Sequence, residues 1–323
     1  MAHYDNIPDT FVRKLATKLK VKTRGRDLED IIADIEKEEK EKIQYLESQF
    51  QFTGGSSMGF TICEPEYRFP DKSKTPKLFL ESLIKETYIK ASNVNREWRP
   101  TLREEIQICA VKHDGNDVYL KLVRGIPRSH VDGYATRTSL KAQFVNIVIH
   151  FSDQIIELRC NASERDIFAE YVLKLLGYGM PAKWHSWTTI NNEQAKKISA
   201  HLKADLISTE LDIKTTVGSM RFNATRSTRV NLRSDKAMQA ILNKIKELNL
   251  PIDDANDEIC EYEYTDVTTG IKIPVVFEMN IKQQSFKFKK PVTEGVIAEV
   301  LDAIIKVSFA EQLTQRQMAA TSE

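Results

Sequence analysis

Residues 146–177 read NIVIHFSDQIIELRCNASERDIFAEYVLKLLG and predict two strands, a tight turn between them and then a helix. The polar residues 152–154 supply the turn, because short polar side chains tolerate its backbone angles. Ser163 is placed to cap the helix, and apolar residues then recur at helical spacing until Gly177. We therefore expect a hairpin with one apolar side, covered by the apolar stripe of the helix that follows.

The same order of hairpin and helix is expected twice more, over residues 220–248 and 274–305. In the second copy the hairpin requires a strand at residues 228–232, and Ser234 and Thr293 are the expected helix caps. Each hairpin has one apolar side that a helix must cover. We therefore predict an α+β fold in which repeated ββα units form a twisted antiparallel sheet with helices on one face, preceded by a small N-terminal helical domain.

The phrase from Ile149 to Leu158, with the helix after it, resembles one half of a TATA-binding-protein-type repeat. In that family a strand ending in Phe turns through small polar residues into a second strand and a long helix. The resemblance covers about thirty residues in each copy and is an analogy of fold. The paired wedge aromatics that the family would show in both halves are not evident in this sequence.

Composition changes along the chain and marks the expected domain boundaries. Residues 50–77 contain glycines and prolines that are typical of a linker. The expected parts are a helical N-terminal domain with a basic first helix at 1–49, a linker at 50–77, a first α+β half at 78–190, a second α+β half with two further ββα units at 191–310, and a flexible tail at 311–323.

The overall composition is that of a globular protein, with 29% charged and 41% hydrophobic residues in a chain of 323. The N-terminus lacks the apolar block of a secretory signal, and no apolar run reaches the roughly eighteen residues of a membrane span. We expect no membrane association and a cytoplasmic or other reducing intracellular location. The widely spaced Cys63, Cys109, Cys160 and Cys260 are expected to be buried free thiols, so no metal and no cofactor are expected.

The net charge of +1 conceals clusters of basic residues. One cluster lies on the first helix, another on residues 124–141, which we expect to be a long loop because they contain Gly125 and Pro127. A third lies between residues 214 and 246, where Asp235 is the only acidic residue, and a fourth between 282 and 290. The candidate nucleic-acid contacts in these clusters are Lys18, Lys20, Lys22, Arg24, Arg26, Arg124, Arg128, Arg137, Lys141, Arg221, Arg226, Arg229, Arg233, Lys236, Lys282, Lys287, Lys289 and Lys290.

These clusters lead to the hypothesis of a non-catalytic nucleic-acid-binding protein, with duplex DNA favoured over RNA. Each lysine or arginine that contacts a phosphate releases counterions, so binding would weaken steeply with salt. Little base-reading chemistry is evident, so specificity would come from DNA shape or from a partner. The account requires the separate clusters to converge on one surface of the folded chain.

A protein–protein scaffold, or a subunit of a larger complex, is the alternative. In that interpretation the basic residues are a solvated face, and the N-terminal helices or an open sheet edge dock another chain. The acidic second helix would then neutralise the basic first one. The acidic residues at 253–263 are expected to lie in a solvated connection.

An enzyme of unrecognised class, such as a nuclease, is the second alternative. The hairpin from Asp117 to Lys121 lacks the acidic residue two positions before the lysine that a restriction-type nuclease requires. His113, Asp114 and Asp117 are explained by turn formation. Because no catalytic signature is present, we assign no catalytic residue.

Overall fold

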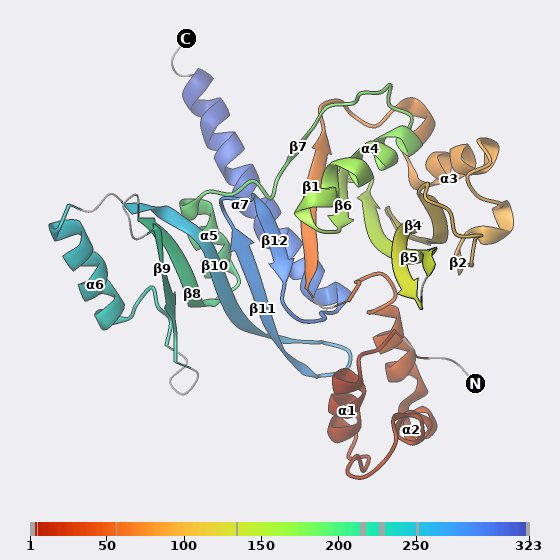
Figure 1. The fold of residues 1–323 in the computed structure, drawn as a ribbon, viewed down its shortest axis with the longest axis horizontal. Helices are drawn as coiled ribbons and strands as arrows, with labels where there is room; N and C mark the ends of the chain where they lie inside the picture. The colour runs from red at the N-terminus through yellow and green to blue at the C-terminus, as the bar shows by residue number, and fades with distance from the viewer. Residues whose placement is uncertain are drawn as a thin grey trace. The chain divides into compact units, whose positions relative to one another are not determined.

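The computed structural model describes residue 4 and residues 6–55, 57–133, 135–213, 218–225, 230–249 and 252–320 (Figure 1). The protein is an α+β protein with antiparallel strands, as predicted. It divides into two compact units, one made of residues 59–187 and the other of residues 1–58 and 188–323. The unit of residues 1–58 and 188–323 therefore contains both ends of the chain.

The unit of residues 59–187 is built on an antiparallel sheet with strand order β2-β3-β4-β5-β6-β1 and with β7 paired to β1. Short 3₁₀ helices lie at Asp71–Ser73, Ala91–Asn93 and Ala162–Glu164. The other elements are β1 (Met58–Pro65), α3 (Pro76–Lys85), β2 (Arg96–Glu97), β3 (Gln107–Asp114), β4 (Asp117–Asp132), β5 (Ala135–His150), β6 (Ile155–Arg159), α4 (Arg165–Leu176) and β7 (Trp184–Ser186).

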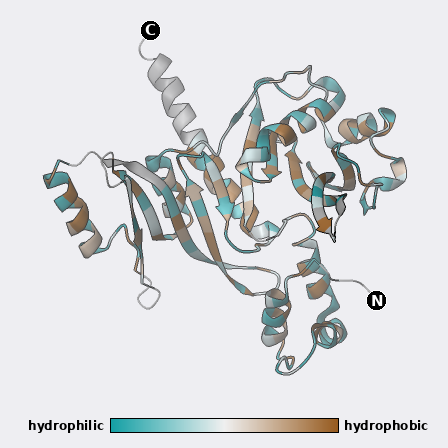
Figure 2. Cartoon of the chain, viewed as in Figure 1, coloured by the Kyte–Doolittle hydropathy of each residue, from teal (hydrophilic) through white to brown (hydrophobic). Residues whose placement is uncertain are grey.

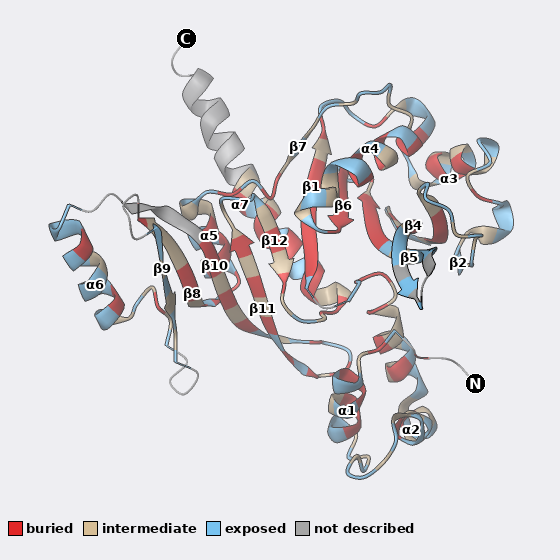
Figure 3. Cartoon of the chain, viewed as in Figure 1, coloured by how far each residue is buried: buried red, intermediate tan, exposed pale blue. Residues whose placement is uncertain are grey.

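The core of this unit lies between one face of the sheet and the helices α3 and α4. Alternate residues of β4 and β5, such as Leu120 and its cross-strand partner Ile147, point to that face and are fully buried. Phe79 of α3 and Phe168 of α4 belong to the same buried cluster. Figures 2 and 3 show hydrophobic and buried stretches along α3, α4 and the strands of this unit. The period of two in the strands and the apolar stripes of the helices therefore meet in one core.

The predicted hairpin and helix at residues 146–177 are confirmed as β5, β6 and α4. Gly177 ends α4 with φ of 94°, and its amide donates to the carbonyl oxygens of Leu173 and Lys174 at 3.1 and 2.9 Å. Ser163 does not cap the helix. It lies in the short 3₁₀ helix before α4, whose N-cap is Glu164.

The unit of residues 1–58 and 188–323 contains a sheet with strand order β12-β11-β10-β8-β9. Tyr45 donates to Asp266 at 2.9 Å and Glu294 donates its amide to Gln49 at 3.1 Å, so the N-terminal helices pack with the rest of this unit. The elements are α1 (Asp9–Lys18), α2 (Leu28–Ser48), α5 (Asn192–His201), β8 (Asp205–Ile213), β9 (Gly218–Asn223), α6 (Lys236–Glu247), β10 (Ile252–Thr265), β11 (Lys272–Asn280), β12 (Ser285–Phe288) and α7 (Glu294–Ala320).

Three equivalent ββα units are not confirmed. The third predicted copy is present as the hairpin β11–β12 followed by α7. In the second, β9 is instead the second strand of the β8–β9 hairpin, and residues 230 and 231 are irregular where a strand was predicted. Residues 228 and 229 lie outside the part of the chain that the structure describes.

Two other segments differ from the prediction. Residues 50–77, predicted as a linker, contain β1, whose side chains are almost all buried. Residues 253–263, predicted as a solvated connection, form most of β10, which pairs with both β8 and β11. Glycine, proline and acidic residues are poor strand formers, but tertiary pairing overrides that local preference.

The four cysteines are free and buried, as predicted. Burial raises the pKa of the Cys109, Cys160 and Cys260 thiols to about 12. Among the helices that the structure describes, none is both long enough and apolar enough to cross a membrane.

Candidate nucleic-acid interface

Residues 124–141 do not form the predicted loop but continue β4 and β5 as a two-stranded ribbon. The two strands pair over 16 residues each, from Asp117 opposite His150 to Asp132 opposite Ala135. Beyond Val123, β4 no longer pairs with β3, so only β5 continues beside it. We call residues 124–132 and 135–143 the β4–β5 ribbon.

The position of Pro127 explains why a proline is tolerated in this ribbon. The Gly125 amide points away from β5 and donates to the Arg103 carbonyl oxygen at 2.5 Å. The orientation of the backbone in a strand repeats every two residues. The nitrogen of Pro127, two residues after Gly125, therefore also points away from β5. Its missing N–H therefore costs the β4–β5 ladder nothing, as at an edge strand.

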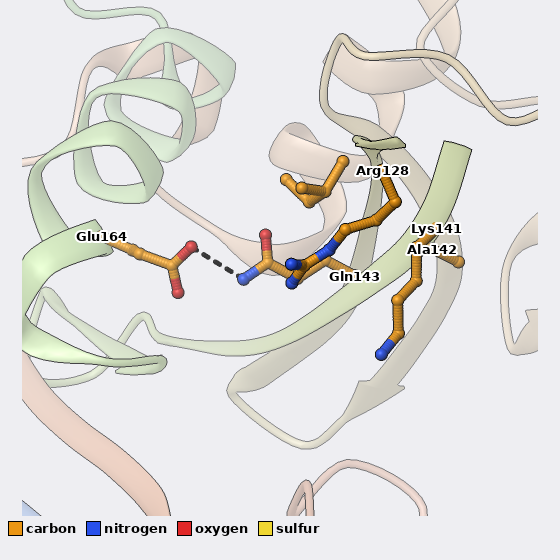
Figure 4. A pocket seen from close by; sticks show the side chains of 6 residues that line it. Arg128, Lys141, Ala142, Gln143 and Glu164 are labelled. Atoms are coloured by element: carbon orange, nitrogen blue, oxygen red, sulfur yellow. Dashed lines mark hydrogen bonds between the residues drawn. The ribbon is translucent and has the colours of Figure 1, made fainter. Parts of the chain in front are cut away.

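One face of the β4–β5 ribbon gathers four of the predicted basic residues. Cross-strand pairing sets Arg124 opposite Gln143, Ile126 opposite Lys141, and Arg128 opposite Ser139, while Arg137 lies opposite His130. Because alternate residues share a face, all of these positions lie on the same side of the ribbon. A cavity of about 300 Å³ opens on this side, and its lining residues are Ile126, Arg128, Lys141, Ala142, Gln143 and Glu164 (Figure 4).

The base of the cavity is a hydrogen-bonded network that neutralises Arg124. Its guanidinium donates to Glu164 Oε1 at 2.7 Å and to Gln143 Oε1 at 2.8 Å, and it lies 5.2 Å from the centre of the Phe168 ring. Gln143 Nε2 also donates to Glu164 Oε1, at 2.7 Å. Arg124 and Glu164 are both mostly buried, so this network is a fixed and electrically neutral base.

The wall of the cavity carries two uncompensated cations. Arg128 and Lys141 are exposed, and neither forms an ion pair with any residue that the structure describes. The Arg128 guanidinium extends toward Gln143, and Lys141 projects from the neighbouring strand (Figure 4). The lining residues Arg128, Lys141 and Glu164 have a net charge of +1, and Arg124, which does not line the cavity, forms an ion pair with Glu164. Arg137, further along the ribbon, is also exposed.

Two of the five predicted basic residues between 221 and 236 are paired with carboxylates. Arg221 donates to Glu210 at 2.5 Å and to Asp257 at 2.7 Å, and Arg233 forms an ion pair with Glu258. The central position of β10 brings Asp257 and Glu258 beside Arg221 and Arg233, so the positive charge of these two residues is neutralised. Arg226 and Arg229 lie outside the described residues, and Lys236 is exposed at the start of α6.

The cluster at residues 282–290 is also partly neutralised. Lys282 lies 3.2 Å from Asp212, Lys289 pairs with Glu278, and Lys287 lies opposite Glu278 on the neighbouring strand. Lys290 is exposed. Burial, and then the positive charge of Lys290, lower the pKa of Lys14, so these two cations lie close to each other.

The N-terminal cluster is divided. Arg26, which lies in the connection between α1 and α2, forms an ion pair with Asp34 of α2 at 2.7 Å. Lys18, Lys20, Lys22 and Arg24 are exposed and form no ion pair within the described parts of the chain. This group is a second basic surface, and it belongs to the unit that does not contain the ribbon.

A buried polar network on β4, β5 and β6 was not identified from the sequence. His150 is bonded through Nδ1 to Asp117 at 3.0 Å and through Nε2 to Glu157 at 3.2 Å, and Glu157 accepts from Arg159 at 2.5 Å. Burial opposes the charge of His150, but the hydrogen bonds to Asp117 and Glu157 outweigh it and raise its pKa to about 9. Each group is satisfied by another, so we interpret the network as structural.

Lys121, from the hairpin considered for catalysis, and Trp187 both have partners within the fold. Lys121 donates to both oxygens of Glu97 at 3.1 and 3.0 Å, and Trp187 donates to Glu64 at 2.6 Å while its ring is buried. Within the described ranges, no group of three or more His, Cys, Asp or Glu residues could hold a metal ion. Comparison with protein-family models and with curated proteins gives no match for this chain.

Proposed function

We propose that this chain binds nucleic acid without catalysing a reaction, and that it contacts phosphates through the basic face of the β4–β5 ribbon. The single observation that carries the proposal is that Arg128 and Lys141 line one cavity as exposed cations with no described ion pair. By contrast, Arg221 and Arg233, which lie in the most strongly basic segment of the sequence, are neutralised by carboxylates.

Duplex DNA is the proposed ligand, because a two-stranded β-ribbon has dimensions that fit the major groove. Arg128 and Arg137 lie on different strands of the same face and would reach phosphates at separate points along the ribbon. The exposed residues Lys18, Lys20 and Lys22 are proposed as a second, non-specific contact. Such contacts position the protein and carry little sequence information.

Binding of a labelled blunt duplex at low and at moderate salt tests this proposal. We expect retention that weakens steeply with salt, and we expect the double variant Arg128→Ala with Lys141→Ala to bind more weakly at every salt concentration. The matched control removes Lys77 and Lys85, which are exposed on α3 of the same unit. If neither the wild type nor the control retains the duplex, or if both double variants lose affinity equally, the proposal is wrong.

The opposite face of the same ribbon favours a second candidate function, a protein-binding scaffold. Val131 and Leu140 of the ribbon, and Phe144 next to it on β5, alternate with the basic residues and are 75%, 38% and 59% exposed. Exposed apolar residues that gather on one face are typical of protein interfaces. Under this alternative, Leu140→Ser with Phe144→Ser abolishes co-purification of protein partners, whereas removal of Arg128 and Lys141 leaves it unchanged.

A further inference from the structure

The cavity on the β4–β5 ribbon contains one negative group as well as two positive ones. At the bottom of the cavity, Glu164 Oε1 accepts two hydrogen bonds, one from Arg124 and one from Gln143. No described residue donates to Glu164 Oε2, although Glu164 lines the cavity. A ligand in the cavity therefore meets the cations Arg128 and Lys141. It also meets Glu164 Oε2, which repels an anion and accepts a hydrogen bond from an N–H donor.

The size of the cavity limits the ligand to one nucleotide-sized group. A volume of about 300 Å³ is at the lower end of small-molecule pockets. The half-buried Ile126 side chain adds an apolar surface beside the charged groups. One phosphate near Arg128 and Lys141, with one unpaired base toward Glu164, satisfies every charged group in the lining.

We propose that the cavity binds an unpaired nucleotide whose base carries an exocyclic amino group, as in cytosine or adenine, with its phosphate at Arg128 and Lys141 and its amino group donating to Glu164. The proposal rests on the proposed nucleic-acid binding and deepens it. A carboxylate accepts a hydrogen bond from the cytosine N4 amino group, whereas the equivalent position in uracil is the acceptor O4. Because two lone pairs cannot share a hydrogen bond, uracil is disfavoured at this position.

The fixed hydrogen bonds of Glu164 at the bottom of the cavity give this proposal a specific test. In the variant Glu164→Gln, the donors of Arg124 and Gln143 hold the carbonyl oxygen of the new amide in the place of Oε1. The amide nitrogen then occupies the place of Oε2 and offers a donor to the ligand. The variant should therefore prefer uracil to cytosine, a reversal that a purely structural role for Glu164 does not produce.

The experiment compares a short duplex with a blunt end, with an unpaired dC tail and with an unpaired dU tail. We expect the wild type to bind the dC tail about tenfold more tightly than the dU tail, and Glu164→Gln to lose or reverse that ratio. The control Glu81→Gln, at an exposed position of α3, should keep it. Thermal unfolding confirms that each variant is folded.

The outcomes separate this inference from the proposed function. Equal binding of both tails, still weakened by loss of Arg128 and Lys141, overturns base recognition and leaves the phosphate contacts in place. A dC preference that survives Glu164→Gln unchanged also overturns the assignment of Glu164. Absence of binding to all three duplexes overturns both proposals.

Discussion

Arg159 donates a 2.5 Å hydrogen bond from Nε to Glu157 Oε1, and both side chains are only 1% exposed. The other Glu157 oxygen bonds to His150, so the carboxylate is held between two positive groups. Burial favours the neutral form of Glu157, but Arg159 and His150 outweigh it and lower its pKa. Removal of one partner from such a buried ion pair takes away a compensating charge inside the fold and therefore destabilises the protein.

The first prediction concerns this ion pair. Glu157→Gln removes the buried carboxylate that bonds to both Arg159 and His150, so we expect the free energy of unfolding to fall by about 3–5 kcal/mol. Urea denaturation measures the change, and Glu105→Gln at an exposed position is the control. A loss below about 1 kcal/mol would show that the pair does not stabilise the fold as the geometry indicates.

The second prediction concerns the pH dependence of stability. The pKa of His150 is about 9 in the folded chain, above the ordinary value of about 6.5 for an unfolded histidine. The stabilisation by protonated His150 is therefore complete below about pH 6.5 and is lost as the pH rises toward 9, at about 1.4 kcal/mol per pH unit. Denaturation from about pH 6 to pH 8.5 should show this loss in the wild type and in the exposed-turn variant His113→Gln. His150→Gln should not show it, and equal slopes in all three proteins would contradict the assignment.

The third prediction uses two glycines. A Cβ atom at Gly59 would overlap the carbonyl oxygen of Cys160, directly after the neighbouring strand β6, whereas a Cβ atom at Gly55 meets nothing within 4 Å. We expect Gly59→Ala to lower the free energy of unfolding by about 1–3 kcal/mol, because the two strands must separate. Gly55→Ala should be neutral or slightly stabilising. Similar melting temperatures for both variants would show that β1 and β6 do not pack as closely as described.

The fourth prediction separates the base of the cavity from its wall. Arg124→Ala removes charged hydrogen bonds to Glu164 and Gln143 and should lower the free energy of unfolding by about 1.5–3 kcal/mol. Arg128→Ala removes an exposed side chain and should change stability by less than about 0.5 kcal/mol. Equal destabilisation by the two changes would mean that Arg128 also has a structural role.

The sequence predicts those elements that local patterns determine. The hairpin and helix at residues 146–177 combine a polar turn, alternating apolar residues and a terminal glycine, and all of these signals agree. The ribbon was missed because Pro127 and Gly125 are typical of loops. Only the pairing with β5, and the direction of the missing N–H, show that a proline fits there.

The charge distribution could not be predicted from the sequence for a related reason. Asp257 and Glu258 are far from Arg221 and Arg233 in the sequence, and only the order of strands in the sheet brings them together. Glu157 and Arg159 alternate with apolar residues, which is typical of an exposed strand face, yet both are buried. Local sequence therefore identified basic residues but not the carboxylates that neutralise them.

The salt dependence of duplex binding tests the central claim most directly, since it counts the phosphate contacts that each group of basic residues makes. We predict that Arg128→Ala with Lys141→Ala reduces the slope of log affinity against log salt by about 1, because the two side chains share one phosphate and each lost phosphate contact contributes about 0.9. Arg221→Ala with Arg233→Ala, in which paired guanidinium groups are removed, should leave the slope of the folded protein unchanged. The opposite pattern, with an unchanged slope in the ribbon variant, would contradict the account.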